Sequence, residues 1–153
     1  MAALKSRLLA AVRDTRGSEI VEMAFVLPIL LFLMGGILDM GFLFNRYETL
    51  TNAAREGARM AAVPGMATED VQARVNAYLA AAGINTAAVT TVVTPVPIAV
   101  GAASMNGVRV VVTYPYNYML LGPMARLVQV STSFDTVTLT ASATMRSEIA
   151  AGL

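Results

Sequence analysis

The stretch "IVEMAFVLPILLFLMGGILDMGFLF", residues 20–44, decides the fold of this chain, and Glu22 and Asp39 are its only charged residues. A helix of this length reaches roughly 37 Å at about 1.5 Å per residue, enough to cross a hydrocarbon core of about 30 Å. The uncharged centre, residues 23–38, is shorter than the usual span of about 20 residues. The two end charges are therefore expected near the membrane interfaces or beside a partner. The stretch predicts a transmembrane helix at residues 18–44.

Two other interpretations of this stretch stay open. A buried core helix is also apolar, but a domain this small rarely buries such a rod on all sides. A cleaved secretory signal also has a basic N-terminal side. This apolar run is longer than such a signal, however, and no A-x-A cleavage pattern follows it.

The basic residues around the span indicate its orientation. Residues 1–17 form a basic leader with four Lys or Arg residues and one acid, Asp14. Arg46, Arg55 and Arg59 follow the span, and nearby glutamates offset them. This mild bias predicts a cytoplasmic N-terminus and an extracytoplasmic domain at residues 45–153.

The composition argues against most enzyme classes. The chain has 153 residues, a net charge of +1, and neither cysteine nor histidine. Disulfides, thiolate nucleophiles, histidine bases and the usual zinc ligands are therefore excluded, and no basic field for nucleic acid exists. A tethered hydrolase would need a Ser-Lys or carboxylate pair, but Lys5 is the only lysine and it precedes the span. We expect no catalytic residue, no cofactor and no metal.

Helix is expected to continue past the membrane segment to about residue 62, where Pro64-Gly65 ends it. Its less polar positions recur every three or four residues, and most are small. They are Leu43, Tyr47, Leu50, Ala54, Gly57 or Ala58, and Ala61. This stripe predicts close packing of the distal half of the helix on a domain.

The remaining residues predict that domain. A second helix is expected from Thr68, as its N-cap, to Gly83. A strand at residues 88–94 is expected to be irregular or to end at Pro95 or Pro97, and Asn106-Gly107 is expected to form a tight turn.

Two further strands follow. The first, at residues 108–114, has Val108, Val110, Val112 and Tyr114 on one face. After a short helix or packed loop, residues 136–145 alternate between apolar residues and Thr or Ser, as in an antiparallel sheet beside a helix. The fold class is therefore α+β: a long N-terminal transmembrane helix continues into a small antiparallel sheet domain with a second helix. This outline resembles that of pilins, so the fold is expected to be pilin-like.

The motifs "RGSEIVEMAFVLPILLFLMGGILDMG" (residues 16–41) and "LTNAAREGARMAA" (residues 50–62) resemble the TadE-like family of pilus-assembly proteins. These are pseudopilins of the tight-adherence (Flp, type IVb-like) secretion system. "TLTASATMRSE", residues 138–148, is similar to the family's closing strand. The match covers about residues 16–62, and the rest agrees in layout.

The resemblance implies cleavage by a prepilin peptidase after Gly17, which makes Ser18 the new N-terminus and Glu22 the fifth mature residue. It also implies a place in the bacterial inner membrane with the C-terminal domain in the periplasm, or in an extracellular pilus. The partners implied are membrane lipid, the peptidase, other pilin subunits and the assembly machinery. Met23 departs from the tyrosine of the major pilins, which favours a minor pilin. An unprocessed single-pass scaffold protein of the assembly machinery is the alternative.

Glu22 is the leading candidate for subunit assembly. A carboxylate in hydrocarbon costs roughly 2.5–3.5 kcal/mol, so it needs a partner. The helix dipole favours it near the N-terminus, and a free α-amine of a neighbouring subunit would pair with it. The alternative is a glutamate that faces lipid headgroups.

Four other charged residues are candidates for subunit contacts. Asp39 is expected to be hydrated at the outer interface, to pair with Arg46, or to contact a partner subunit. Arg55, Glu56 and Arg59 form a cluster that is either a solvated helix face or a subunit contact.

Overall fold

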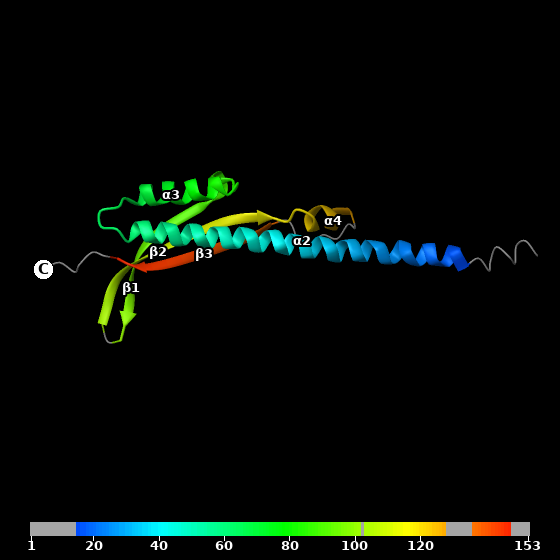
Figure 1. The fold of residues 1–153 in the computed structure, drawn as a ribbon, viewed down its shortest axis with the longest axis horizontal. Helices are drawn as coiled ribbons and strands as arrows, with labels where there is room; N and C mark the ends of the chain where they lie inside the picture. Colours follow the sequence, from blue (N-terminus) through cyan, green and yellow to red (C-terminus); the bar gives the residue numbers. More distant parts are fainter. Residues whose placement is uncertain (1–14, 102, 128–135, 148–153) are drawn as a thin grey trace, which may run out of the picture.

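A computed structural model gives the structure of the chain, and it describes residues 15–101, 103–127 and 136–147. The elements in chain order are helices α2 (Thr15–Ala61) and α3 (Thr68–Ala81), the 3-10 helix η1 (Thr86–Ala88), strands β1 (Thr90–Val100) and β2 (Ala103–Asn117), helix α4 (Leu121–Leu127) and strand β3 (Thr136–Arg146). All the other elements lie along the C-terminal part of the rod formed by α2, and α4 reaches slightly past its middle (Figure 1). The expected α+β arrangement is confirmed. Of the predicted leader, residues 1–14 lie outside the described residues.

Helix α2 is a single helix of 47 residues, about 70 Å long. Pro28 lies inside it and removes one backbone hydrogen bond, but the helix continues to Ala61. The helix is long and apolar enough to cross a membrane, and only 6% of its most apolar 18-residue window is buried. This exposure excludes the buried core helix. The predicted continuation of the helix past residue 44 is confirmed.

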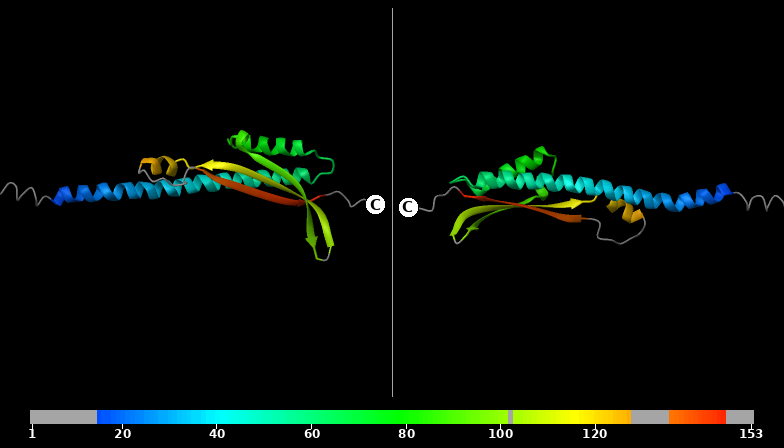
Figure 2. Two further views of the ribbon diagram at one scale, coloured as in Figure 1. Left: turned by 180° about the vertical axis from the view of Figure 1, so that it is seen from behind. Right: turned by 60° about the horizontal axis from the view of Figure 1, so that its bottom comes forward.

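The three strands form one antiparallel sheet in the order β1-β2-β3. Val110 and Val112 in β2 pair with Ala143 and Ala141 in β3, so the apolar positions of both strands share one face. Helices α2 and α3 cover this face, with α2 over β2 and β3 and α3 against β1 (Figure 2). The opposite face of β3 carries exposed Thr and Ser, as predicted. The core residues are Leu50, Ala53, Ala54, Ala58, Val71, Val75, Leu79, Ile84, Val110, Val112, Tyr116, Leu139 and Ala141.

Gly57 marks the closest approach of α2 to its neighbours. A Cβ at this position would lie 2.6 Å from Cγ2 of Val75 in α3 and 3.3 Å from Cγ1 of Val110 in β2. Both contacts are with β-branched side chains, which have little freedom to move. The small-residue stripe therefore brings the backbone of α2 against both α3 and the sheet, as the sequence predicts.

Strand β1 does not end at its prolines, so the predicted end of the strand is wrong. It runs to Val100, and Pro95 and Pro97 pair with Val108 and Asn106. Because β1 is an edge strand, two prolines two residues apart can both turn their nitrogens toward the free edge, where no donor is needed.

The predicted turn at Asn106-Gly107 is also wrong, because both residues lie inside β2. The hairpin turns between Val100 and Ala103 instead, with Gly101 at a φ of +61°. Gly107 allows a close approach instead, because a Cβ there would overlap the side chain of Ile98. Glycine occurs in tight turns and also at close contacts inside strands, so its presence in the sequence does not identify a turn.

Helix α3 confirms the second predicted helix, with one correction at its start. Ala67 is the N-cap and no side chain caps the helix, so Thr68 is its first residue rather than its N-cap. At the other end Gly83 has a φ of +71° and Ile84 N–H donates to the Leu79 carbonyl at 3.0 Å. This is the glycine-terminated end that the sequence predicts.

Replacing Gly57 by valine should destabilise the domain by about 1–3 kcal/mol, because the new side chain overlaps Val75 and Val110. Gly41→Val is the matched control, since a Cβ at Gly41 meets nothing within 4 Å on the same helix. Thermal unfolding of the full chain in detergent measures both variants. Equal midpoints for the two would contradict the close packing at Gly57.

Candidate functional site

The N-terminal part of α2, as far as Leu31, is an apolar rod that the rest of the described chain leaves bare. Every residue from Gly17 to Leu31 is exposed, Phe25 by 73%. Gly17 and Ser18 lie in the first turn of the helix, and Glu22 lies one turn further on. Glu19 and Glu22 line a shallow surface groove with Met23 and Val26. Glu22 makes no hydrogen bond or ion pair with another described residue, so its carboxylate is open to a partner.

Asp39 is the most enclosed charged residue of the described chain, with no exposed surface. Its Oδ1 accepts hydrogen bonds from the backbone N–H groups of Met119 and Leu120 at 3.0 and 3.1 Å. Its Oδ2 accepts from Leu120 at 3.0 Å and from Leu121 at 2.7 Å. These donors lie at the start of α4, where helix N–H groups have no partner in their own helix. Asp39 therefore fastens the segment that leads into α4 to the middle of α2.

Two glycines beside Asp39 let this segment approach the helix. A Cβ at Gly35 would lie 3.6 Å from Cβ of Leu120 and 3.0 Å from Sδ of Met124. A Cβ at Gly36 would lie 3.8 Å from Cδ2 of Leu121. The Gly-Gly-x-x-Asp sequence at residues 35–39 is thus a docking site for α4, with a flat backbone surface and a carboxylate in register.

The expected hydration of Asp39 is wrong, because residues 119–121 enclose its carboxylate. The expected pairing with Arg46 is wrong as well: Arg46 Nη1 donates to the carbonyl of Ala82 at 3.2 Å. Contact of Asp39 with a partner subunit stays a prediction.

The charge cluster on the distal half of α2 connects two helices. Glu56 Oε1 accepts from Arg59 Nη2 at 3.0 Å and from Arg74 Nη2, on α3, at 3.1 Å. The hydrogen bonds from Arg59 and then Arg74 hold the pKa of Glu56 below its ordinary value of 4.5. Arg55 is exposed and makes no ion pair with another described residue. The structure therefore brings Glu56 and Arg59 together and leaves Arg55 outside the cluster.

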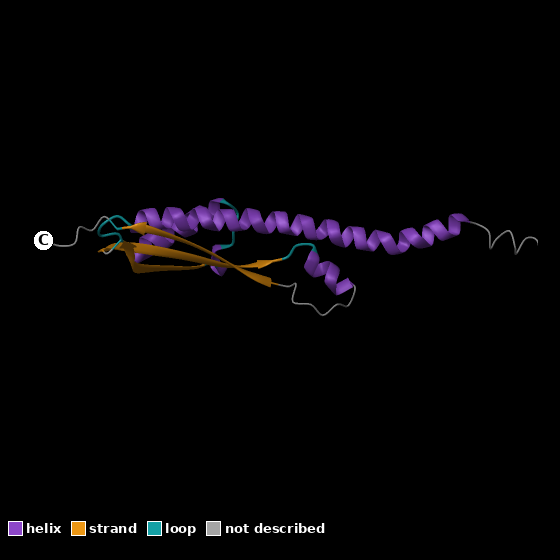
Figure 3. Ribbon diagram, turned by 90° about the horizontal axis from the view of Figure 1, so that it is seen from below, coloured by secondary structure: helices purple, strands orange, loops and turns teal. Residues whose placement is uncertain are grey.

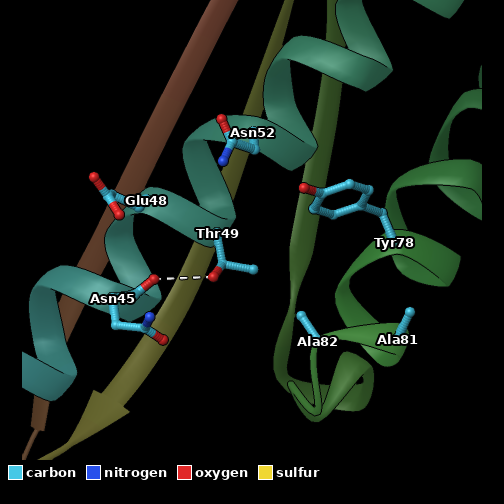
Figure 4. A pocket seen from close by; sticks show the side chains of 7 residues that line it. All are labelled: Asn45, Glu48, Thr49, Asn52, Tyr78, Ala81 and Ala82. Carbon is cyan, nitrogen blue, oxygen red and sulfur yellow. Dashed lines mark hydrogen bonds between the residues drawn. The ribbon is translucent and has the colours of Figure 1, made fainter.

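An open groove of about 350 Å³ lies between α2 and α3. It is lined by Asn45, Glu48, Thr49, Asn52, Tyr78, Ala81 and Ala82 (Figure 4). The Thr49 hydroxyl donates to the carbonyl of Asn45 at 2.9 Å. Glu48 is the one carboxylate in this lining, so the groove lacks the paired acid and base of a hydrolytic site. No group of three or more potential metal ligands occurs among the described residues.

The fold defines an α+β protein with one N-terminal helix that could span a membrane. A family model described as TadE-like protein matches residues 17–59, which are almost all of α2. The resemblance to the TadE-like family is thereby confirmed over this helix, and it supports a protein related to pilus assembly. Neither the curated proteins nor the solved structures gave a significant match.

The partners of Glu56 and Asp39 come from distant parts of the chain and were not predicted from the sequence. Arg74 reaches Glu56 from another helix, and no local spacing indicates this pair. The donors to Asp39 are backbone N–H groups 80 to 82 residues away in sequence. The only sequence feature that indicates this contact is the Gly-Gly pair that begins four residues before Asp39. Glycine is also common in membrane helices without such a contact, so the feature is weak.

Asp39→Ala should release α4 from α2, because three N–H groups would lose their acceptor. Leaving buried donors unsatisfied costs about 1–3 kcal/mol each, so we expect faster hydrogen exchange of the amides at residues 119–121. Asp70→Ala, which removes an exposed carboxylate in the first turn of α3, is the control. Unchanged exchange in Asp39→Ala, measured on the full chain in detergent by mass spectrometry, would refute the docking role.

Proposed function

We propose that this chain is a minor pilin, or pseudopilin, of a tight-adherence (Flp, type IVb-like) pilus system. In this proposal a prepilin peptidase cleaves it after Gly17, and it acts in pilus assembly or secretion without being an enzyme. The observation that carries the proposal is Glu22, which is exposed on a bare apolar helix five residues after Gly17. The TadE-like match to residues 17–59 supports it.

Cleavage would change the chemistry around Glu22. Removal of residues 1–17 makes Ser18 the first residue, with a positively charged α-amine in place of an amide. Glu22 then lies about 6 Å along the axis from the new terminus, where the helix dipole favours a carboxylate. In this position it can accept the α-amine of a neighbouring subunit while both lie near lipid. A paired carboxylate avoids much of the cost of an isolated charge in hydrocarbon.

The remaining partners follow from the same helix. Its bare half faces membrane lipid before assembly and other pilin subunits after it. Arg55 is exposed on the distal half and is the cationic group of the predicted cluster that is left for another chain. We place the N-terminus in the cytoplasm and the domain of residues 45–153 in the periplasm, on the basis of the basic leader.

One observation favours the alternative of an unprocessed single-pass scaffold protein. Gly17 lies inside α2, whereas a peptidase acts on extended backbone. Cleavage therefore requires the first turn of α2 to unwind. Glycine has low helix propensity, by about 1 kcal/mol relative to alanine, which lowers the cost of unwinding at this end.

The mature chain should begin at Ser18 when it is produced together with a prepilin peptidase. Intact mass and N-terminal sequencing of the membrane-extracted protein measure this. Gly17→Leu should retain the leader, whereas Gly41→Leu on the same helix should be processed normally. A leader that is retained by the parent chain would support the scaffold alternative instead.

Glu22→Ala should leave the protein in the membrane fraction but prevent its association with other pilus subunits, because the α-amine loses its acceptor. Co-purification of the subunits from membranes measures the association. Glu69→Ala, an exposed glutamate on α3, is the control and should associate normally. Normal association of Glu22→Ala would argue against the pairing and for a scaffold.

A further inference from the structure

Helix α4 and a bilayer require the same face of α2. On the side where α4 docks, the bare part of the rod ends before Gly35, about 22 Å from Ile20 at 1.5 Å per residue. On the other sides of the rod, exposed hydrophobic residues continue to Phe44. A hydrocarbon core of about 30 Å needs about 20 residues, so a full span that begins at Ile20 reaches Asp39. The segment that leads into α4 docks on Gly35, Gly36 and Asp39. Figure 3 shows α4 as a short helix beside the middle of α2. Full insertion therefore brings lipid to positions that α4 covers.

The docked α4 is poorly suited to hydrocarbon. It runs back along α2 toward the N-terminus, because residues 119–121 lie at Asp39 while Met124 lies at Gly35. Arg126 follows Met124 and is exposed, so it would lie on the lipid-facing side and deeper than Gly35. A charge in the span costs roughly 2.5–3.5 kcal/mol. The non-helical residues 118–120 would also enter the lipid, and irregular backbone is not tolerated where it faces lipid.

The docked state is nevertheless well built outside lipid. Both Asp39 oxygens accept backbone N–H groups, and the two glycines leave room for the side chains of Leu121 and Met124. In the inserted state Asp39 would lie at the end of the span, where water at the interface would solvate its carboxylate. The carboxylate of Asp39 therefore has hydrogen-bond donors in both states: backbone N–H groups when α4 is docked, and water when the helix is inserted.

We propose that docking of α4 on residues 35–39 and full insertion of this part of α2 into the bilayer exclude each other. In the inserted state α4 is detached from α2, and residues 35–39 contact lipid. When residues 35–39 leave the bilayer, α4 docks on them. This inference rests on the proposed membrane span and adds a step to it: withdrawal of the helix is coupled to closure of α4, which covers the face that lipid has left.

A disulfide can hold the docked state. The ideal Cβ of Gly35 lies 3.6 Å from the Cβ of Leu120, within the usual range for a disulfide. The chain has neither cysteine nor tryptophan, so the pair Gly35→Cys/Leu120→Cys and a single probe, Ile37→Trp, introduce the only such groups. Ile37 is 66% exposed, so the larger side chain is accommodated. The full chain is reconstituted in vesicles with brominated lipids, and quenching of the tryptophan is measured with the disulfide closed and after reduction.

Quenching should be lost when the disulfide is closed and recover on reduction, because a brominated lipid quenches a tryptophan only when it comes close to the indole. Leu120→Cys alone is the control and should not respond to oxidation. Unchanged quenching with the disulfide closed would overturn the proposal, since α4 would then enter the bilayer together with the helix.

Two further variants separate this inference from the membrane span. Leu30→Trp should be quenched in both redox states, and a failure there would contradict the span itself rather than the role of α4. Asp39→Ala, combined with Ile37→Trp, weakens docking by another route and should leave quenching at least as strong as in the Asp39 chain. Weaker quenching in that variant would also overturn the proposal.

Discussion

The structure depends on how closely the backbone of α2 approaches the sheet. Ala53, Ala54 and Ala58 have no exposed surface, and Gly57 lies where any side chain would overlap Val75. With large residues in this stripe, α2 would lie further from β2 and β3. Helix α3 could then not contact both α2 and the sheet. The domain itself is small, so it gains its core by using the distal half of α2 as one of its own elements. The rod and the domain are thus one folding unit rather than an anchor with a separate head.

The sequence predicts the fold where a periodic signal is long. The apolar run, the small-residue stripe and the Thr-alternating strand each gave an element that the structure contains. The predictions from the sequence are wrong where one residue type serves two structural purposes. Pro95 and Pro97 end most strands but are accommodated at the edge of a sheet, and Gly107 makes room for Ile98 rather than a turn.

The candidate site could also be predicted only in part. Glu22 was identified from its position in the apolar run, and its exposure agrees with an open carboxylate. The surroundings of Asp39 and Glu56 could not be predicted, because their partners come from residues 119–121 and from Arg74. Contacts between elements far apart in sequence leave no local pattern. A lone aspartate in an apolar helix indicates that a partner exists, but not which one.

The edge prolines also affect how copies of this protein can meet. In the proposed assembly, chains held in one membrane would be concentrated and oriented alike, and these conditions favour pairing of exposed strands between chains. Pro95 and Pro97 remove two donors from the free edge of β1, whereas no proline lies in β3 at the other edge. Sheet growth through β3 alone pairs two chains and then stops, because each pair offers only β1 edges. Open-ended sheet polymerisation is thereby disfavoured.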